Sequence, residues 1–233
     1  MRTLFWAVVM ASVLAVTPAH AADGGHSGGE PKGDAKAGKQ LVTKGKPDNP
    51  MVMPCQSCHG TDGKGNPQAK FPRLAGQNMQ YMVKQLKDFA SGDRTNYPTM
   101  TNIAKGMSEQ EMWDAARYYN QQKVDVEGAD AEKAMIKLGE QIAERGVPEQ
   151  NVPACTSCHG PKGLGVPPVF PQIAGQHASY IEKQLQDWEA GNRQNDPAKM
   201  MTDIAPKLSE KQMKAVGAYF SHVDAQQGGS AKH

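Results

Sequence analysis

The sequence is poor in aromatic residues, in cysteine and in long hydrophobic runs. Phe, Trp and Tyr make up 6% of its 233 residues, and hydrophobic residues of all kinds make up 38%. A core built from these side chains alone would be thin. All four cysteines fall in two short motifs, which leaves none for a structural disulfide. Basic and acidic residues nearly balance, so the sequence offers no clustered basic face for nucleic acid.

The two cysteine motifs have the form C-x-x-C-H and occupy residues 55–59 and 155–159. This spacing is typical of covalent haem attachment, because two thiols three residues apart can form thioethers with one porphyrin. The histidine that follows then offers a nitrogen to the iron. A thioredoxin-like dithiol would need a βαβ setting, and a zinc site would need further Cys or His ligands nearby. We therefore predict two covalently bound haem c groups, attached through Cys55, Cys58, Cys155 and Cys158 and ligated by His59 and His159.

The amino-terminal residues predict a secretory signal peptide over residues 1–21. Arg2 precedes an apolar run over residues 4–16, and Ala19-His20-Ala21 has the form of a cleavage site. The apolar run is short for a membrane span, although an uncleaved anchor is the alternative. Because thioether haem attachment takes place outside the bacterial cytoplasm, motif and signal together predict a periplasmic protein. Residues 22–37 are rich in Gly, Ser, Lys and Asp and are expected to form a disordered lead-in.

The remaining chain is an internal repeat of one unit, with the two copies offset by about 100 residues. Residues 71–77 (Phe-Pro-Arg-Leu-Ala-Gly-Gln) correspond to residues 170–176 (Phe-Pro-Gln-Ile-Ala-Gly-Gln), and the agreement continues through residues 81–94 and 180–193. A repeat of this length indicates a duplicated domain. We predict a first haem domain over 38–124, a linker over 125–130, a second haem domain over 131–224 and a flexible tail over 225–233.

Each unit has helical periodicity, and no stretch alternates as a strand does. Residues 38–44 and 131–145 are amphipathic and end at Gly45 and Gly146, and residues 77–90 place apolar side chains at spacings of three and four. Ser108 and Ser209 each precede Glu or Gln by three residues, which predicts a capping box. The expected fold is all-α, with each small domain wrapped around one haem.

The second axial ligand of each iron is sought among thirteen methionines. Only two methionine pairs recur in register after the motifs: Met100 with Met201, and Met112 with Met213. The second pair falls in a capped helix, where an apolar side chain normally packs inward. The first pair falls in a proline-containing loop, so we predict Met100 and Met201 as ligands. Met200 stays open as an alternative in the second domain. His177, His222 and His233 have no twin in the other repeat and are expected at the surface.

The duplicated unit resembles the dihaem cytochrome c4 family, a branch of the class I c-type cytochromes. The resemblance is carried by Phe-Pro-x-(Leu/Ile)-Ala-Gly-Gln, then Tyr-x-x-x-Gln-Leu, then Met-x-x-Ile-Ala, and it covers residues 38–222. It implies one His/Met haem in each domain. It also implies that the carbonyls of Pro72 and Pro171 orient the proximal histidines. A further implication is a helix crossing in each domain, between Gly38 and Tyr118 and between Gly139 and Tyr219.

The function predicted from these features is electron transfer in the periplasm, by a carrier that is not an enzyme. The expected partners are redox proteins such as a terminal oxidase or a quinol-oxidising complex, with no nucleic acid. We expect a monomer, and peripheral association with a membrane is left open. The alternatives are a haem subunit of a larger oxidoreductase, such as a flavocytochrome sulfide dehydrogenase, or a dihaem enzyme such as a peroxidase or a thiosulfate dehydrogenase.

Overall fold

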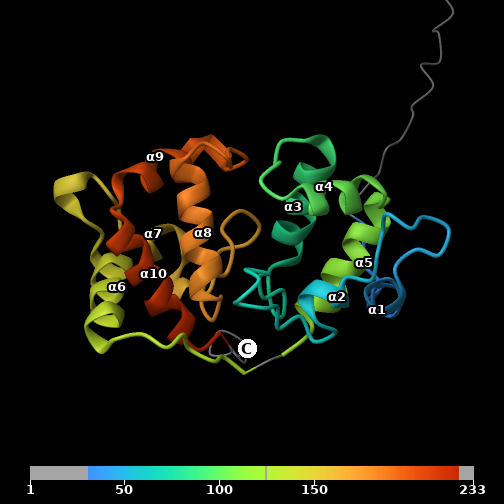
Figure 1. Cartoon of the computed structure of the whole chain (residues 1–233), viewed down its shortest axis with the longest axis horizontal. Helices are drawn as coiled ribbons and strands as arrows, with labels where there is room; N and C mark the ends of the chain where they lie inside the picture. Colours follow the sequence, from blue (N-terminus) through green and yellow to red (C-terminus); the bar gives the residue numbers. More distant parts are fainter. Residues whose placement is uncertain (1–30, 124, 226–233) are drawn as a thin grey trace, which may run out of the picture. The chain divides into compact units, whose positions relative to one another are not determined.

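The computed structural model describes residues 31–123 and 125–225. The predicted signal peptide, most of the lead-in and nearly all of the predicted tail lie outside these residues. The helices within them form two successive groups (Figure 1). The first group comprises α1 (Ala35–Lys44), α2 (Gln56–His59), α3 (Met79–Ser91), α4 (Pro98–Lys105) and α5 (Glu109–Asn120). The second group comprises α6 (Lys133–Arg145), α7 (Thr156–His159), α8 (Ala178–Glu189), α9 (Met200–Ile204) and α10 (Glu210–His222).

The described residues contain no strand, only three isolated β-bridges, so the all-α prediction is confirmed. The two groups repeat each other element by element, apart from short 3₁₀ turns in the second: Pro148–Gln150, Pro161–Gly163, Pro197–Lys199 and Ala205–Lys207. We call residues 31–123 the first half and residues 125–225 the second half. In the part of the chain that is described, no helix combines the length and the apolar content needed to cross a bilayer.

Local sequence signals account for the ends of most helices. Ser108 and Ser209 form the two predicted capping boxes. Each serine side chain accepts from the backbone N–H of Glu111 or Gln212, and the side chain of that residue accepts from the serine N–H. Gly45 and Gly146 end α1 and α6 at φ values of 65° and 71°, a region that favours glycine.

The first helix begins at Ala35, three residues before the predicted start of the first domain. Composition alone assigned residues 35–37 to a disordered lead-in, and that assignment is wrong for these three. The Asp34 carboxylate caps the helix by accepting from the N–H of Lys36 at 2.7 Å. The Asp34 N–H donates in turn to the carboxylate of Asp114 on α5, also at 2.7 Å. A contact 80 residues away therefore orders this segment.

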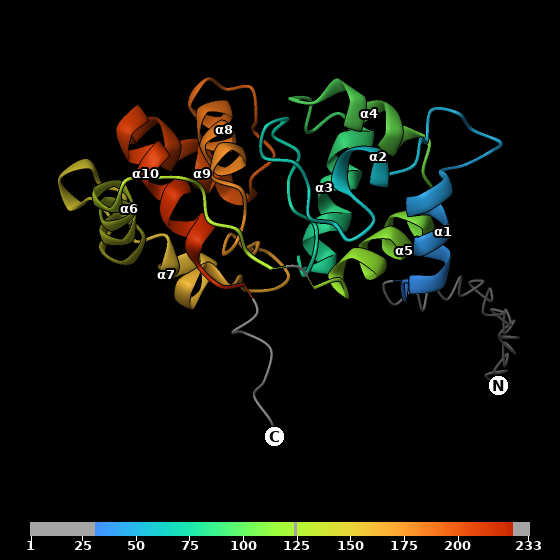
Figure 2. The same cartoon turned by 60° about the horizontal axis from the view of Figure 1, so that its bottom comes forward.

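The first and last long helices of each half cross each other (Figure 2). A glycine lies at each crossing. A Cβ on Gly38 would lie 2.0 Å from the Asp114 carbonyl oxygen and 2.9 Å from the Tyr118 Cβ. A Cβ on Gly139 would meet the Ala215 oxygen at 2.0 Å and the Tyr219 Cβ at 2.7 Å. The structure thus confirms the two predicted crossings, where only a residue without a side chain lets the backbones approach.

Each half has its own hydrophobic core. Met112 and Met213 are 4% and 0% exposed, which confirms that this methionine pair packs inward. Met100 and Met201, in contrast, were expected in a loop and lie in helices α4 and α9. Pro98 is the first residue of α4, where its missing N–H costs no hydrogen bond and its fixed φ suits the helix. The proline that predicted a loop therefore starts a helix.

Candidate haem sites

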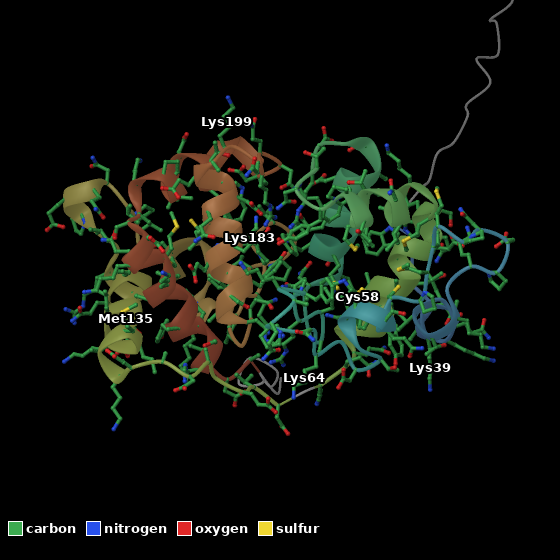
Figure 3. All side chains as sticks on the ribbon, in the orientation of Figure 1. Lys39, Cys58, Lys64, Met135, Lys183 and Lys199 are labelled. Carbon is green, nitrogen blue, oxygen red and sulfur yellow. The ribbon has the colours of Figure 1, made fainter. Side chains whose placement is uncertain are left out.

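Each C-x-x-C-H motif forms a single helical turn. The N–H of His59 bonds to the carbonyl of Cys55 at 3.0 Å, and the N–H of His159 bonds to that of Cys155 at 2.9 Å. This turn brings the two thiols and the ring onto neighbouring positions of one helical face. Figure 3 shows Cys58 at the end of α2. The sequence motif is therefore also a local structural unit in both halves.

The setting of the four cysteines does not suit dithiol redox chemistry. Burial raises the pKa of Cys55 and of Cys155 to about 11. Reactive dithiols have a lowered pKa instead, since the thiolate is the attacking species. Among the described residues no three His, Cys, Asp or Glu side chains gather as a metal site would require. Both observations disfavour the thioredoxin-like and zinc alternatives.

The histidine of each motif is held by the carbonyl of a proline. The Nδ1 of His59 lies 3.1 Å from the Pro72 oxygen, and the Nδ1 of His159 lies 2.9 Å from the Pro171 oxygen. Burial lowers the pKa of both rings, so they are neutral at pH 7 and Nδ1–H must be the donor. The Nε2 atom of each ring is then a free acceptor, as an iron ligand must be. The proline role implied by the family resemblance is present in both halves.

One cavity of about 880 Å³ contains both motifs. Its walls include Cys55, Cys58 and His59 with their counterparts, and apolar side chains from both halves. Met100, Met200 and Met201 all line it. The cavity supplies thiols, a neutral imidazole and thioether sulfurs around an apolar space in each half, which is what a covalently held porphyrin requires. The choice of Met100 and of Met201 over Met200 stays a prediction.

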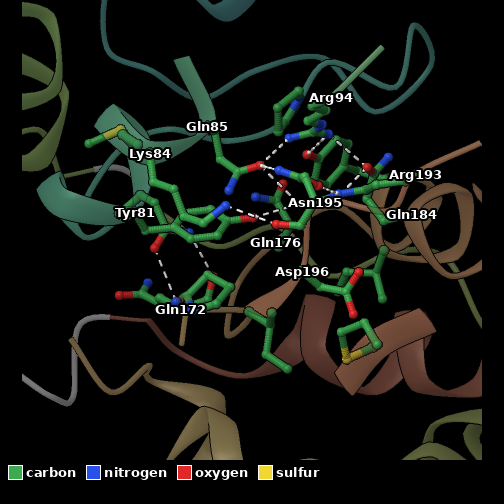
Figure 4. A pocket seen from close by; sticks show the side chains of 18 of the residues that line it. Tyr81, Lys84, Gln85, Arg94, Gln172, Gln176, Gln184, Arg193, Asn195 and Asp196 are labelled. Atoms are coloured by element: carbon green, nitrogen blue, oxygen red, sulfur yellow. Dashed lines mark hydrogen bonds between the residues drawn. The ribbon is translucent and has the colours of Figure 1, made fainter. Parts of the chain in front are cut away.

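A polar cluster borders this cavity where the two halves meet (Figure 4). Arg94 and Arg193 are each 3% exposed. The Gln184 Oε1 accepts from Arg94 at 2.8 Å and from Arg193 at 2.9 Å. The Gln85 Oε1 accepts from the same two guanidinium groups at 2.8 and 3.0 Å. Each arginine therefore bonds to glutamines of both halves.

The charge of this cluster is positive. The hydrogen bonds of Arg94 and Arg193 go to neutral oxygens of Gln, Asn and Tyr side chains. Asp88 and Asp187 pair with Lys84 and Lys183 on their own helices. The Asp196 carboxylate, which also lines the cavity, accepts from the N–H and the hydroxyl of Thr202. Two buried cations beside an apolar cavity favour a ligand that brings its own negative groups. The two carboxylates of a haem satisfy this condition.

These residues lie in the repeated segments 81–94 and 180–193, and the sequence predicts no role for them. Gln85 with Gln184 and Arg94 with Arg193 are matched pairs of the repeat, and Gln85 and Gln184 recur at buried positions of α3 and α8. A repeated polar residue within an apolar helix face is the signal that could have found them. His177, expected at the surface, is half-buried and its Nε2 lies 2.8 Å from the Lys64 carbonyl oxygen of the first half.

Comparison with known proteins agrees with this geometry. The family model for cytochrome c matches twice, over residues 35–123 and 136–224. The chain belongs to the cytochrome c family, as a dihaem cytochrome of the c4 type. Its cofactors are two covalently bound haem c groups, one for each pair of cysteines, and its function is electron transfer between redox protein partners.

The relatives include cytochromes c4 and electron acceptors of thiosulfate dehydrogenase. Cytochrome c4 of Stutzerimonas stutzeri is 41% identical over 197 residues, covering 80% of this chain and 88% of that protein. The solved structure of reduced cytochrome c4 from Pseudomonas stutzeri has a TM-score of 0.71 and 37% identity, covering 82% of this chain and all of that one. The thiosulfate dehydrogenase electron acceptor of Stutzerimonas stutzeri (strain A1501) is 38% identical over 231 residues, covering 98% and 100%.

The prediction of an electron carrier that is not an enzyme is contradicted by the relatives named for thiosulfate dehydrogenase. The solved thiosulfate dehydrogenase of Marichromatium purpuratum matches with a TM-score of 0.76 and 31% identity over 82% of this chain. This chain spans 40% of the length of that chain, so the likeness concerns part of it. What the comparisons support is an electron-transfer protein with an enzyme-associated role.

Proposed function

We propose that this dihaem cytochrome accepts electrons from a periplasmic oxidoreductase and passes them to a respiratory partner through two His/Met-ligated haems. The observation that carries the proposal is the single cavity with a C-x-x-C-H motif, a neutral buried histidine and cavity-lining methionines in each half. When bound, each haem supplies a one-electron couple. The chain's own residues attach it, orient the imidazole and exclude water from the apolar cavity.

The proposed ligand pairs are His59 with Met100 and His159 with Met201. Met201 packs against the core of the second half and matches Met100 in the repeat. Replacing a thioether ligand by imidazole lowers a haem's reduction potential, since axial-ligand identity sets that potential over a range of about 0.8 V.

Methionine-to-histidine variants test these ligands by spectroelectrochemistry. We expect Met100→His and Met201→His each to lower one of the two potentials, and Met200→His to leave both unchanged. Loss of the sulfur-to-iron absorption band in the same variants gives a second readout. If Met200→His lowers a potential and Met201→His does not, the ligand of the second haem is Met200.

The electron donor that we propose is an enzyme that oxidises thiosulfate. Support comes from the electron acceptors of thiosulfate dehydrogenase in Stutzerimonas stutzeri and Thiomonas intermedia, the latter 38% identical over 187 residues. Two haems in one chain can take up two electrons before either is passed on. The periplasmic location rests on the signal-like residues 1–21 and on the site of thioether haem attachment.

A stopped-flow experiment tests this donor. The oxidised holoprotein is mixed with thiosulfate, with and without a purified thiosulfate dehydrogenase, while haem reduction is followed optically. Reduction that requires the dehydrogenase supports the proposal. Reduction by thiosulfate alone would place the oxidation in this chain itself, and no reduction in either mixture would exclude this donor.

A further inference from the structure

Two buried glutamines cross from one half of the molecule to the other. Gln77 and Gln176 occupy the same position of the repeat, and each is 7% exposed. The Gln176 side chain accepts from the Arg73 N–H and donates to the Arg73 carbonyl, both at 2.9 Å. The Gln77 side chain likewise accepts from the Gln172 N–H at 3.0 Å and donates to the Gln172 carbonyl at 2.8 Å. The contacts are reciprocal, because each half contributes one glutamine that bonds to the backbone of the other half.

Each glutamine bonds to the backbone of one residue in the opposite half. That residue comes immediately after the proline whose carbonyl holds the axial histidine. The N–H of Arg73 and the C=O of Pro72 belong to one peptide group. That group donates to Gln176 Oε1 at one end and accepts from His59 Nδ1 at the other, at 2.9 and 3.1 Å. In the second half, the peptide group of Pro171 and Gln172 links Gln77 Oε1 to His159 Nδ1. A single peptide unit therefore separates each glutamine from the histidine of the opposite half.

The orientation of the two amides is determined by their surroundings. Gln176 Oε1 also accepts from the N–H of His177 at 3.0 Å, and Gln77 Oε1 accepts from the N–H of Asn78 at 2.9 Å. Two N–H groups converge on each side-chain oxygen, while each side-chain nitrogen faces a carbonyl. Rotating either amide by 180° would place donors against donors, so the oxygen must lie towards the proline peptide.

We propose that Gln176 tunes the haem of the first half and Gln77 tunes the haem of the second, each acting across the interface. Hydrogen bonds in a chain polarise one another, so donation by the Arg73 N–H makes the Pro72 oxygen a stronger acceptor. A stronger bond to Nδ1–H makes the imidazole a more basic ligand, which favours ferric iron. The inference rests on the proposed ligation by His59 and His159, and both glutamines are positioning residues.

The decisive variants are Gln176→Leu, Gln77→Leu and Gln176→Glu in the full-length holoprotein. Gln176→Leu should raise the reduction potential of the first-half haem and leave that of the second, and Gln77→Leu should do the reverse. In the reduced protein, the Nδ1–H proton of the histidine opposite the substitution should move upfield in an NMR spectrum. Gln176→Glu keeps an oxygen acceptor for the Arg73 N–H, so it should not raise the first potential.

The crossed pattern separates tuning from loosened packing. A glutamine with a merely structural role would shift the potential of its own half, or both alike, and Glu would disrupt it as much as Leu. Either result overturns the inference, as does an unchanged Nδ1–H signal in both Leu variants. If the oxidised wild-type protein lacks hyperfine-shifted signals from His59 and His159, the proposed ligation fails instead.

Discussion

Substituting Gln184 is expected to destabilise both halves, because its side-chain oxygen serves a buried arginine from each. Gln184→Leu removes the bonds of 2.8 Å to Arg94 and 2.9 Å to Arg193 and leaves both guanidinium groups in place. A hydrogen bond to a charged group contributes about 1.5–3 kcal/mol, so the two together are worth about 3–6 kcal/mol. Burying the leucine offsets about 1–2 kcal/mol of this loss. We expect the free energy of unfolding to fall by about 2–4 kcal/mol.

Gln186→Leu is the matched control on the same helix. Its side chain makes one bond, at 3.1 Å, to Glu182 a turn earlier, so its effect should stay within about 0.5 kcal/mol. Urea unfolding of the oxidised holoprotein, followed by far-UV circular dichroism and by haem absorption, measures both. Equal effects of Gln184→Leu and Gln186→Leu would refute the assignment of the arginine cluster as a stabilising link between the halves.

Two further variants test other parts of the structure. Gly139→Ala places a Cβ 2.0 Å from the Ala215 oxygen and should cost about 1–3 kcal/mol in urea unfolding, whereas Glu140→Ala on the exposed face should cost little; equal values would remove the close crossing as the reason for glycine. Burial lowers the pKa of His177, and the positive charges of Arg73 and Lys64 act in the same direction. The bond to the Lys64 carbonyl and the charge of Glu127 oppose this shift. Its unfolded pKa is about 6.5, so its contribution to stability is complete above that pH and is lost on acidification. Asn is the residue at the matching position of the first half. The His177→Asn variant should therefore lose less stability than the wild type between pH 7.5 and 5. Parallel profiles of unfolding free energy against pH would contradict this.

Features that depend on residues a few positions apart were predictable from the sequence. The C-x-x-C-H turns, the capping boxes at Ser108 and Ser209 and the helix ends at Gly45 and Gly146 all fall where their patterns indicate. The repeat supplied a second test of each assignment, since a role that appears twice in register is rarely accidental. Two haem sites and an all-α fold follow from these local signals.

Contacts between distant parts of the chain were not predictable in this way. Ala35 is helical because Asp34 bonds both to the helix start and to Asp114 on another helix, which composition cannot express. Pro98 begins a helix although prolines also mark loops. His177 is half-buried because it meets a carbonyl of the other half.

The sequence by itself determined what each half binds and how its helices begin and end, because those depend on local covalent spacing and backbone hydrogen bonding. Only the tertiary structure decided that Gln176 reaches the proline peptide of the first half while Gln77 reaches that of the second. The repeat shows that the two glutamines occupy equivalent positions. It does not determine whether their side chains bond within one half or between the two halves. That depends on how the two halves pack together, because buried polar groups must find their partners in the resulting interface.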